Sequence, residues 1–238
     1  MATAEQGHVF SSNCLLSQLP LDELEHLKPQ LRPVELEVRK VIYEPNASIR
    51  YAYFPEQGMI SVVSLMEDGS SIEVGTIGRE GMAGAVLLLE TDTVPYQFFV
   101  QVPGHALRID ATVLKDRAEQ GSALRKLILR YESAFLIQTM QSVACNGLHS
   151  IQKRCCRWLL MARDRAESDE LKLTHEFLAL MLGVRRASIT DVLRPLQDAG
   201  LVRSNHGKIT ILDRQGLEAG ACECYRVIAN QQKRLLAC

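Results

Sequence analysis

The 238-residue chain has little of what marks secreted and disulfide-rich proteins. Its seven cysteines are too few, and odd in number, for a disulfide scaffold. The N-terminus also lacks the basic start and apolar block of a secretory signal peptide. We therefore expect a cytoplasmic protein whose thiols are reduced.

Long hydrophobic runs are missing as well. The longest stretch without charge, residues 133–152, is about as long as a membrane span, but seven of its residues are strongly polar: Gln138, Thr139, Gln141, Ser142, Asn146, His149 and Gln152. We interpret it as a buried or partnered helix and expect no membrane partner. A content of 47% hydrophobic and 23% charged residues is typical of globular proteins, which excludes disorder, collagen and coiled-coil rods.

A net charge of only −1 hides a polarised chain. Residues 149–238 carry 15 Lys and Arg against 10 Asp and Glu, whereas residues 1–148 carry 12 against 18. This asymmetry favours a polyanionic partner for the C-terminal part, with chance clustering of charge as the alternative.

The first half of the chain predicts a helical entry followed by a β-rich domain. Residues 20–31 have Asp22 and Glu23 in their first turn, as helices do. Short runs then predict strands at 34–38, 60–66, 71–77, 97–102 and 106–109, with turns at 45–46, 67–69 and 103–104. Evenly spaced short strands indicate an antiparallel sandwich or roll, so the fold class is α+β.

Glycine recurs every third residue at Gly75, Gly78, Gly81 and Gly84. A phosphate-binding loop would need a longer glycine motif and a parallel βαβ unit, and the sequence predicts neither. We expect a turn between strands, with a short helix that begins near Met82.

A long helix is predicted from residue 122 to 148. Residues on one side alternate spacings of four and three: Leu124, Ile128, Tyr131, Phe135, Gln138, Ser142, Cys145 and His149. We predict that the first six form a dimer seam, although an intramolecular core helix would give the same pattern. A second apolar stripe lies on another face: Leu129, Leu136, Met140 and Val143. Asn146-Gly147 offers a hinge before another amphipathic helix at 150–165.

Residues 173–211 predict a winged helix-turn-helix. Thr174 is a suitable N-cap for a short helix that ends at Gly183. Counting from His175, the fifth, ninth and fifteenth residues are Ala179, Gly183 and Ile189. A small residue, a left-handed glycine and a β-branched residue are required there for two helices to cross and pack.

The second helix, at about 186–199, and the hairpin after it present polar side chains suited to DNA. Near the start of the helix stand Arg185, Arg186, Ser188 and Thr190, which can reach bases or phosphates. The runs 201–204 and 208–211 flank Asn205-His206-Gly207, which predicts a hairpin wing that carries Arg203, His206 and Lys208. A helical hairpin and a β-hairpin used for protein contacts remain the alternative.

In this order, the elements resemble the cyclic-AMP receptor protein and fumarate-nitrate regulator (CRP/FNR) family of bacterial transcription factors. The resemblance implies a roll-shaped sensor domain at 1–121, a dimerisation helix at 122–148 and a DNA-binding domain at 149–238. It also implies a homodimer on a two-fold symmetric DNA operator, with RNA polymerase and a small-molecule effector as further partners. Thr174, Arg186 and His206-Gly207-Lys208 match residues that family members use on DNA.

The sequence departs from the family at positions that set specificity. Ala187 stands where a glutamate is usual and Asp191 where a basic residue is common, which implies a different operator. The loop that holds cyclic nucleotides reads 81–84 Gly-Met-Ala-Gly, and 94–97 Val-Pro-Tyr-Gln lacks the phosphate-binding arginine. We expect an effector other than cyclic AMP, or none, at a candidate pocket formed by Arg79, Glu80, Gly81, Met82, Tyr96 and Gln97.

Neither catalysis nor a bound cofactor is predicted. The six histidines are scattered, so a metal oxygenase site is not indicated, and His175-Glu176 lacks the second histidine of a zinc protease helix. His105 and Cys145 are single candidates for haem ligands, and Cys14 stands alone where iron-sulfur sensors need several cysteines. We expect no metal site, with a thiol-based redox regulator or a protein-interaction module without DNA as the alternatives.

Overall fold

The structure is a computed structural model that describes residues 10–118 and 121–237. It opens with two short helices, α1 (Cys14–Ser17) and α2 (Leu21–Leu27), and a 3₁₀ turn, η1 (Lys28–Gln30). The Asn13 side chain accepts hydrogen bonds from the first turn of α1 and donates to the carbonyls of Pro55 and Gly81. This single buried amide therefore ties the N-terminal helix to the β-domain.

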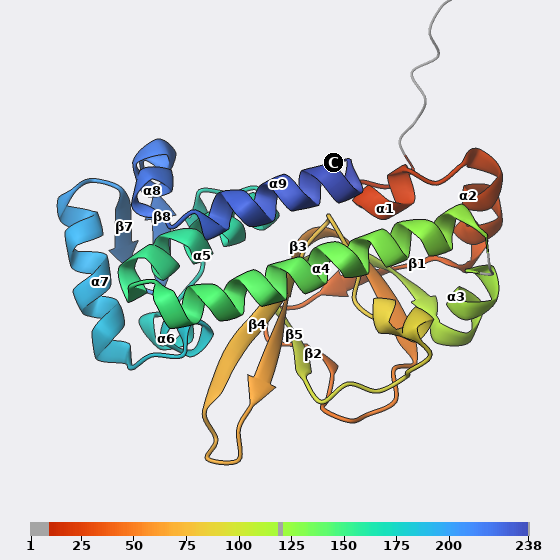
Figure 1. Ribbon diagram of the computed structural model, residues 1–238, viewed down its shortest axis with the longest axis horizontal. Coiled ribbons are helices and arrows are strands. Elements are labelled where there is room, and N and C mark those ends of the chain that lie inside the picture. Colours follow the sequence, from red (N-terminus) through yellow and green to blue (C-terminus); the bar gives the residue numbers. More distant parts are fainter. Residues whose placement is uncertain (1–9, 119–120, 238) are drawn as a thin grey trace, which may run out of the picture.

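The β-domain is one antiparallel sheet that curls into a roll. Its strands are β1 (Arg32–Leu36), β2 (Val41–Tyr43), β3 (Tyr51–Leu65), β4 (Ser71–Ile77) and β5 (Gln97–Asp110). They run in the order β1-β5-β3-β4, and β2 also pairs with β5. Figure 1 shows the roll beneath the long helix, and the predicted antiparallel fold is confirmed.

The turn predicted at Pro103-Gly104 is wrong, because β5 continues through it. The partner strand β3 shifts register opposite this point, which marks a bulge. A Cβ on Gly104 would lie 2.2 Å from the Gln57 carbonyl oxygen, and Gly58 has φ +92°. The glycines thus let two long strands bend together where sequence patterns suggested an interruption.

One helical segment lies between β4 and β5, and two follow β5. They are η2 (Ala85–Leu89), α3 (Ala111–Arg117) and the 26-residue α4 (Ala123–Leu148). The Ser122 hydroxyl caps α4, and Ser150 caps the next helix, α5 (Ile151–Ala166). Asn146-Gly147, the predicted hinge, lies inside α4, and the chain turns at His149 instead because its backbone is extended there.

The C-terminal part forms a winged helix and one further helix. It contains β6 (Glu170–Leu171), α6 (His175–Leu182), α7 (Arg186–Asp198), β7 (Val202–Asn205), β8 (Lys208–Ile211), α8 (Arg214–Gly220) and α9 (Cys224–Leu236). The strands form a small sheet in the order β6-β8-β7. Within the described residues, no helix is long and apolar enough to cross a membrane.

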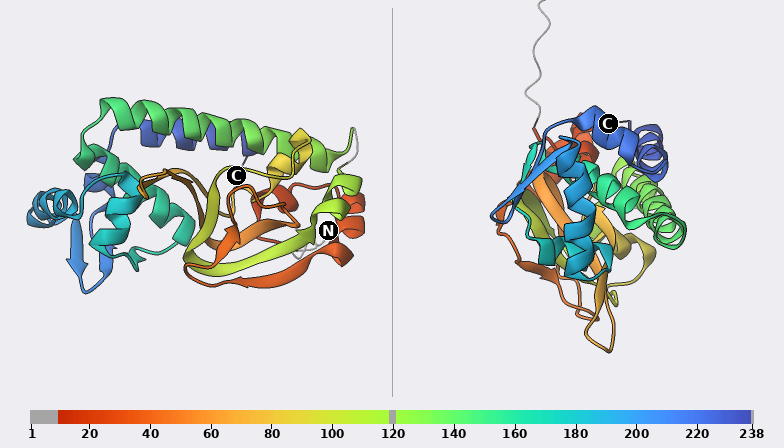
Figure 2. Two further views of the ribbon diagram at one scale, coloured as in Figure 1. Left: turned by 90° about the horizontal axis from the view of Figure 1, so that it is seen from below. Right: turned by 90° about the vertical axis from the view of Figure 1, so that its left-hand side faces the viewer.

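The two halves share their interior. Met59, Val63 and Phe99 of the roll pack into the same core as α5, α6 and α7, and Phe99 meets Phe177 edge to face. The helix α9 then runs back along α4 (Figures 1 and 2), so that Leu236 is buried in the core of the roll. The winged helix is therefore docked against the sensor half from two sides.

Candidate nucleic-acid interface

In the helix-turn-helix, the residues of the predicted pattern have the expected structural roles. The Thr174 hydroxyl accepts a hydrogen bond from the Phe177 amide at 3.1 Å, which caps α6. Gly183 ends α6 with φ +61°, a conformation that glycine adopts without strain. Ala179 and Ile189 are buried where the two helices cross.

The N-terminal end of α7 is open to solvent. Arg185, Arg186 and Thr190 are exposed, and Ser188 is half-buried. The guanidinium of Arg186 pairs with the Glu176 carboxylate on α6, and 67% of the Arg186 side chain is exposed. An exposed pair of this kind holds the side chain weakly, so Arg186 remains available to a ligand.

The wing lies beside the start of α6. His206 and Gly207 both have positive φ, at 44° and 75°, as a two-residue type I′ hairpin turn requires. A Cβ on Gly207 would lie 3.6 Å from Cγ2 of Thr174, so the wing tip and the helix cap are neighbours. Arg203, His206 and Lys208 are exposed, and Lys208 donates to the Glu170 carboxylate at 2.8 Å.

His175 joins the wing to the second helix, a role that the sequence did not reveal. Its Nδ1 lies 3.3 Å from the Thr190 hydroxyl oxygen, and its Nε2 lies 3.0 Å from the Ser204 hydroxyl oxygen. Both hydroxyls can donate or accept, so a neutral imidazole satisfies both contacts. The only signal available was its position directly after the cap, at the first turn of α6.

A buried polar network connects the roll to α5. Arg165 of α5 pairs with Glu80 at 2.7 Å and donates to the side-chain oxygen of Gln138 at 2.9 Å. The Trp158 indole donates to the Glu73 carboxylate at 2.7 Å. Burial raises the pKa of Glu73 from its usual 4.5 to about 7, against the opposing effect of hydrogen bonds from Ser61 and Trp158.

The six residues predicted for an effector pocket do not meet at one site. Arg79 pairs with Glu167 at 2.7 Å, and Glu80 with Arg165, so both face α5. Tyr96 is exposed, and Gln97 donates to Glu44. Arg79 and Glu80 line a cleft of about 570 Å³ between α1, α5 and α9, to which Tyr96 and Gln97 do not contribute.

The remaining two pocket residues are covered by an aromatic side chain of α4. Met82 is buried, and a Cβ on Gly81 would lie 1.9 Å from the Tyr131 ring. A Cβ on Gly75 would similarly lie 2.7 Å from the Phe135 ring. Two glycines of the recurring series therefore serve close packing of rings against the backbone rather than contact with a ligand.

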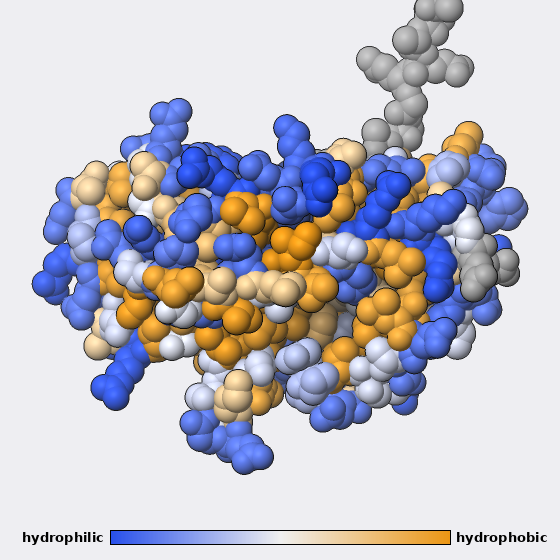
Figure 3. Space-filling model, in the orientation of Figure 1, coloured by the Kyte–Doolittle hydropathy of each residue, from blue (hydrophilic) through white to orange (hydrophobic). Residues whose placement is uncertain are grey.

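The predicted dimer seam is wrong, because its residues face the chain's own interior. Leu124, Ile128, Tyr131, Gln138 and Ser142 are buried against the rest of the chain, and Phe135 packs on the same core. The solvent side of α4 carries the second stripe instead, with Leu136 59%, Met140 64% and Val143 69% exposed. Figure 3 shows apolar side chains gathered over this helix.

The cysteines also depart from the prediction. Cys155 and Cys156 are buried in α5, and burial raises the pKa of both thiols, that of Cys156 to about 11, so neither is reactive. Cys222 precedes α9 and Cys224 begins it. Both side chains approach Cys145 and His149, although no metal site was expected.

Two family descriptions match this architecture. Residues 33–120 match the cyclic nucleotide-binding domain, and residues 153–219 match the Crp-like helix-turn-helix domain. Together they span well over half of the chain and include the roll and the candidate interface. A protein with this pair of domains is a transcriptional regulator with a helix-turn-helix DNA-binding domain.

Relatives and solved structures agree with that class. The Global nitrogen regulator of Nostoc sp. PCC 7120 is 25% identical over 185 residues, 74% of this chain and 82% of the relative. The Transcriptional regulator LdrP of Thermus thermophilus is 25% identical over 199 residues, 77% and 93% of the two chains.

Two solved structures share the fold. A CRP/FNR-family transcriptional regulator from Thermus thermophilus superposes with a TM-score of 0.63 at 22% identity, covering 80% of this chain and 98% of its own. FixK2 from Bradyrhizobium japonicum gives 0.68 at 15% identity, covering 81% and 98%. The chain belongs to the CRP/FNR family of transcriptional regulators.

Proposed function

We propose that the protein acts in the cytoplasm as a homodimer that binds a two-fold symmetric DNA operator. The observation that carries this proposal is the common exposed surface formed by the cap of α6, the start of α7 and the wing tip. A dimer would bring two such surfaces to successive major grooves, roughly 34 Å apart. The function is regulatory, and we assign no catalysed reaction to it.

Within this surface, α7 and the wing have different tasks. We assign base recognition to α7, where Arg186 can bond guanine O6 and N7 and where Arg185, Ser188 and Thr190 reach bases or phosphates. We assign phosphate contacts to Thr174, Arg203, His206 and Lys208. In the free protein, Arg186 and Lys208 form ion pairs with Glu176 and Glu170. The phosphates or bases of DNA would replace these exposed carboxylates.

We place the dimer contact on the solvent side of α4. Leu129, Ser133, Leu136, Met140 and Val143 follow one another at spacings of four, three, four and three residues, the pattern of a helix that packs against a partner helix. An exposed apolar stripe of this length on a helix is costly to leave in water. Two copies of α4 would cover each other's stripes.

We propose that cyclic AMP in the family's usual pose is not the effector. The cyclic-nucleotide loop lacks its carboxylate and arginine, and a buried phosphate without a cationic partner costs several kcal/mol. Tyr131 covers Gly81 at this point. A small-molecule effector would find charged groups instead in the cleft lined by Arg79, Glu80 and Lys233.

Electrophoretic mobility shifts at increasing salt test the proposal. A regulator that neutralises several phosphates should bind duplex DNA with an affinity that falls steeply and linearly on a log–log plot. An enzyme or a protein-interaction module would bind weakly and without preference among sequences. Cyclic AMP, added up to millimolar concentration, should change neither the shift nor the melting temperature.

A further inference from the structure

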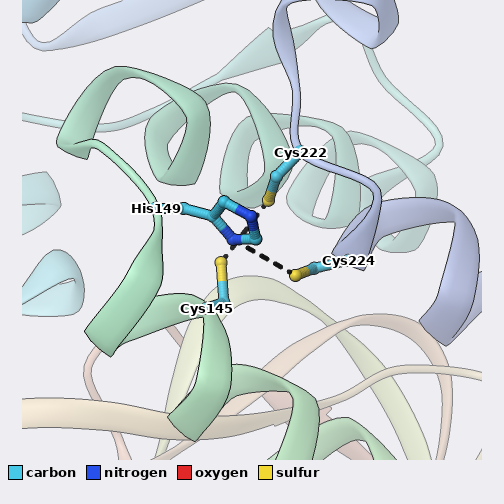
Figure 4. A group of neighbouring side chains, drawn as sticks. All are labelled: Cys145, His149, Cys222 and Cys224. Carbon is cyan, nitrogen blue, oxygen red and sulfur yellow. Dashed lines mark hydrogen bonds between the residues drawn. The ribbon is translucent and has the colours of Figure 1, made fainter.

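Three cysteines and one histidine meet where two helices end and begin. Cys145 lies in the last turn of α4, and His149 caps that helix four residues later, on the same side. Cys222 and Cys224 lie on either side of the start of α9. Figure 4 shows the four side chains directed toward a common centre from these two elements.

The distances between the four donor atoms fit a tetrahedral metal ion. All four lie within 4.8 Å of one another. The sulfurs of Cys145 and Cys222 are 3.4 Å apart, and the Cys224 sulfur is 3.5 Å from Nδ1 of His149. Zinc bonds of about 2.3 Å to sulfur and about 2.0 Å to nitrogen place tetrahedral donors roughly 3.5 to 3.8 Å apart.

The neighbouring side chains already orient the donors. Nε2 of His149 lies 3.3 Å from a carboxylate oxygen of Glu223, which favours the proton on Nε2 and leaves the Nδ1 lone pair directed at the sulfurs. Histidines that bind metals are oriented by carboxylates in this way. Gln141 donates to the Cys224 sulfur at 3.1 Å, as amides do to metal-bound thiolates.

Core packing does not account for the cluster. Cys145, Cys222 and Cys224 are buried, yet they form a small group of their own, separate from the two large hydrophobic cores. Two buried guanidinium groups, Arg154 and Arg157, interact electrostatically with this group. They would offset the single negative charge that three thiolates and a neutral imidazole leave around a divalent ion.

We propose that Cys145, His149, Cys222 and Cys224 bind one zinc ion per chain in a closed, structural site. Three thiolates and one imidazole form a ligand set that zinc favours, and four protein ligands leave no position open for catalysis. An iron-sulfur cluster interposes several atoms between its ligands and needs a wider ring of donors. A disulfide would use only two of the four groups.

The ion would join parts of the chain that are far apart in sequence. Cys145 and His149 belong to the junction of α4 and α5, while Cys222 and Cys224 belong to the link from the winged helix into α9. Arg154, next to the cluster, donates to the Leu182 carbonyl at the end of α6. Zinc would therefore fix α9 on α4 beside the helix-turn-helix. This inference does not depend on which DNA is bound.

The first experiment measures metal content and affinity in the full-length, reduced protein. We expect one zinc per chain by mass spectrometry of the metal, and cobalt added to the metal-free protein should give the absorption of a tetrahedral thiolate complex. Cys222→Ala and His149→Ala should each lower zinc affinity at least tenfold. Cys155→Ala removes an equally buried thiol outside the cluster and should retain one zinc.

A second variant tests the orientation of the histidine. Glu223→Gln keeps the size of an exposed side chain but weakens its hold on His149, and loss of such a carboxylate lowers metal affinity about 10- to 100-fold. Gln215→Ala, at an exposed residue of α8 that lies outside the cluster, should leave affinity unchanged.

Several results would overturn the proposal. These are equal zinc affinity of the wild type and Cys222→Ala, a folded and reduced wild type that binds neither zinc nor cobalt, a Cys145–Cys222 disulfide in the protein as isolated, and iron-sulfur absorption in protein prepared without oxygen. If Cys222→Ala fails to fold, the wild type still decides the question. Its melting temperature should fall when a chelator removes zinc and recover with zinc but not with magnesium.

Discussion

The winged helix and the β-roll differ in what decides the position of their candidate site residues. In the winged helix, a cap at Thr174, a glycine turn at Gly183 and a hairpin turn at His206-Gly207 bring the predicted residues to one exposed surface. In the roll, Glu80 turns toward α5 and Gly81 toward α4, so the predicted pocket does not form. Local backbone geometry positions the residues of the first site, whereas contacts with distant helices keep the residues of the second apart.

Sequence signals predict a site reliably where they fix the backbone locally, and less so where distant contacts decide the geometry. A helix cap or a type I′ turn fixes backbone dihedrals within a few residues, so spacing alone predicts the result. A loop that packs against another element takes its shape from side chains more than 40 residues away, such as Tyr131 and Arg165.

The largest effect is expected at the solvent side of α4, where we place the dimer contact. Leu136→Asp places a charge in the proposed dimer contact and should convert the dimer into a monomer. Because each half-site then binds alone, operator affinity should fall at least about 100-fold. Sedimentation measures the oligomeric state, and mobility shifts measure the operator affinity. Leu21→Asp, at a leucine of α2 that is 70% exposed, should change neither. Unchanged association of the Leu136 variant would refute this contact.

The packing of α4 on the roll predicts the next largest effect. Gly81→Ala should destabilise the protein by about 3 kcal/mol, because its Cβ would overlap the Tyr131 ring. Combining it with Tyr131→Ala should cost clearly less than the sum of the two single changes. Denaturant unfolding of the four proteins gives this coupling, and strictly additive values would mean that the two residues do not touch.

The buried carboxyl of Glu73 predicts a pH dependence at the junction of roll and α5. Its pKa is about 7 in the folded protein and about 4.5 when unfolded, so the folded state binds the proton more tightly. The wild type should therefore lose stability as pH rises from about 4.5 to about 7, by about 2 to 3 kcal/mol. Glu73→Gln should remove this contribution, so that the variant loses less stability than the wild type over the same pH range. A wild type whose stability rises across that window, relative to the variant, would contradict the assignment.

The smallest effects separate base recognition from phosphate contact within the winged helix. Arg186→Ala should cost about 1 to 3 kcal/mol on the specific operator and relax base preference. Lys208→Ala should weaken binding to all sequences alike and reduce the salt slope by about one. Titrations on specific and random DNA distinguish the two. Equal losses on every sequence for both variants would remove Arg186 from base recognition.

The sequence alone predicted the order of roll, long helix and winged helix, because each has its own periodicity. The long helix α4 and the wing were predicted from the helical spacing that begins at residue 122 and from Asn205-His206-Gly207, since these signals are local. The sequence could not predict that β5 passes through Pro103-Gly104, or which side of α4 faces solvent. Both depend on partners elsewhere in the chain. For the same reason, the approach of Cys222 and Cys224 to Cys145 was missed.

Selection of bound duplexes from a random DNA pool by the full-length protein tests the central claim most directly. The account predicts enrichment of one sequence made of two inverted half-sites, with centres about one helical turn apart, bound by two chains. Failure to enrich any sequence, or enrichment of a single half-site bound by one chain, would contradict it.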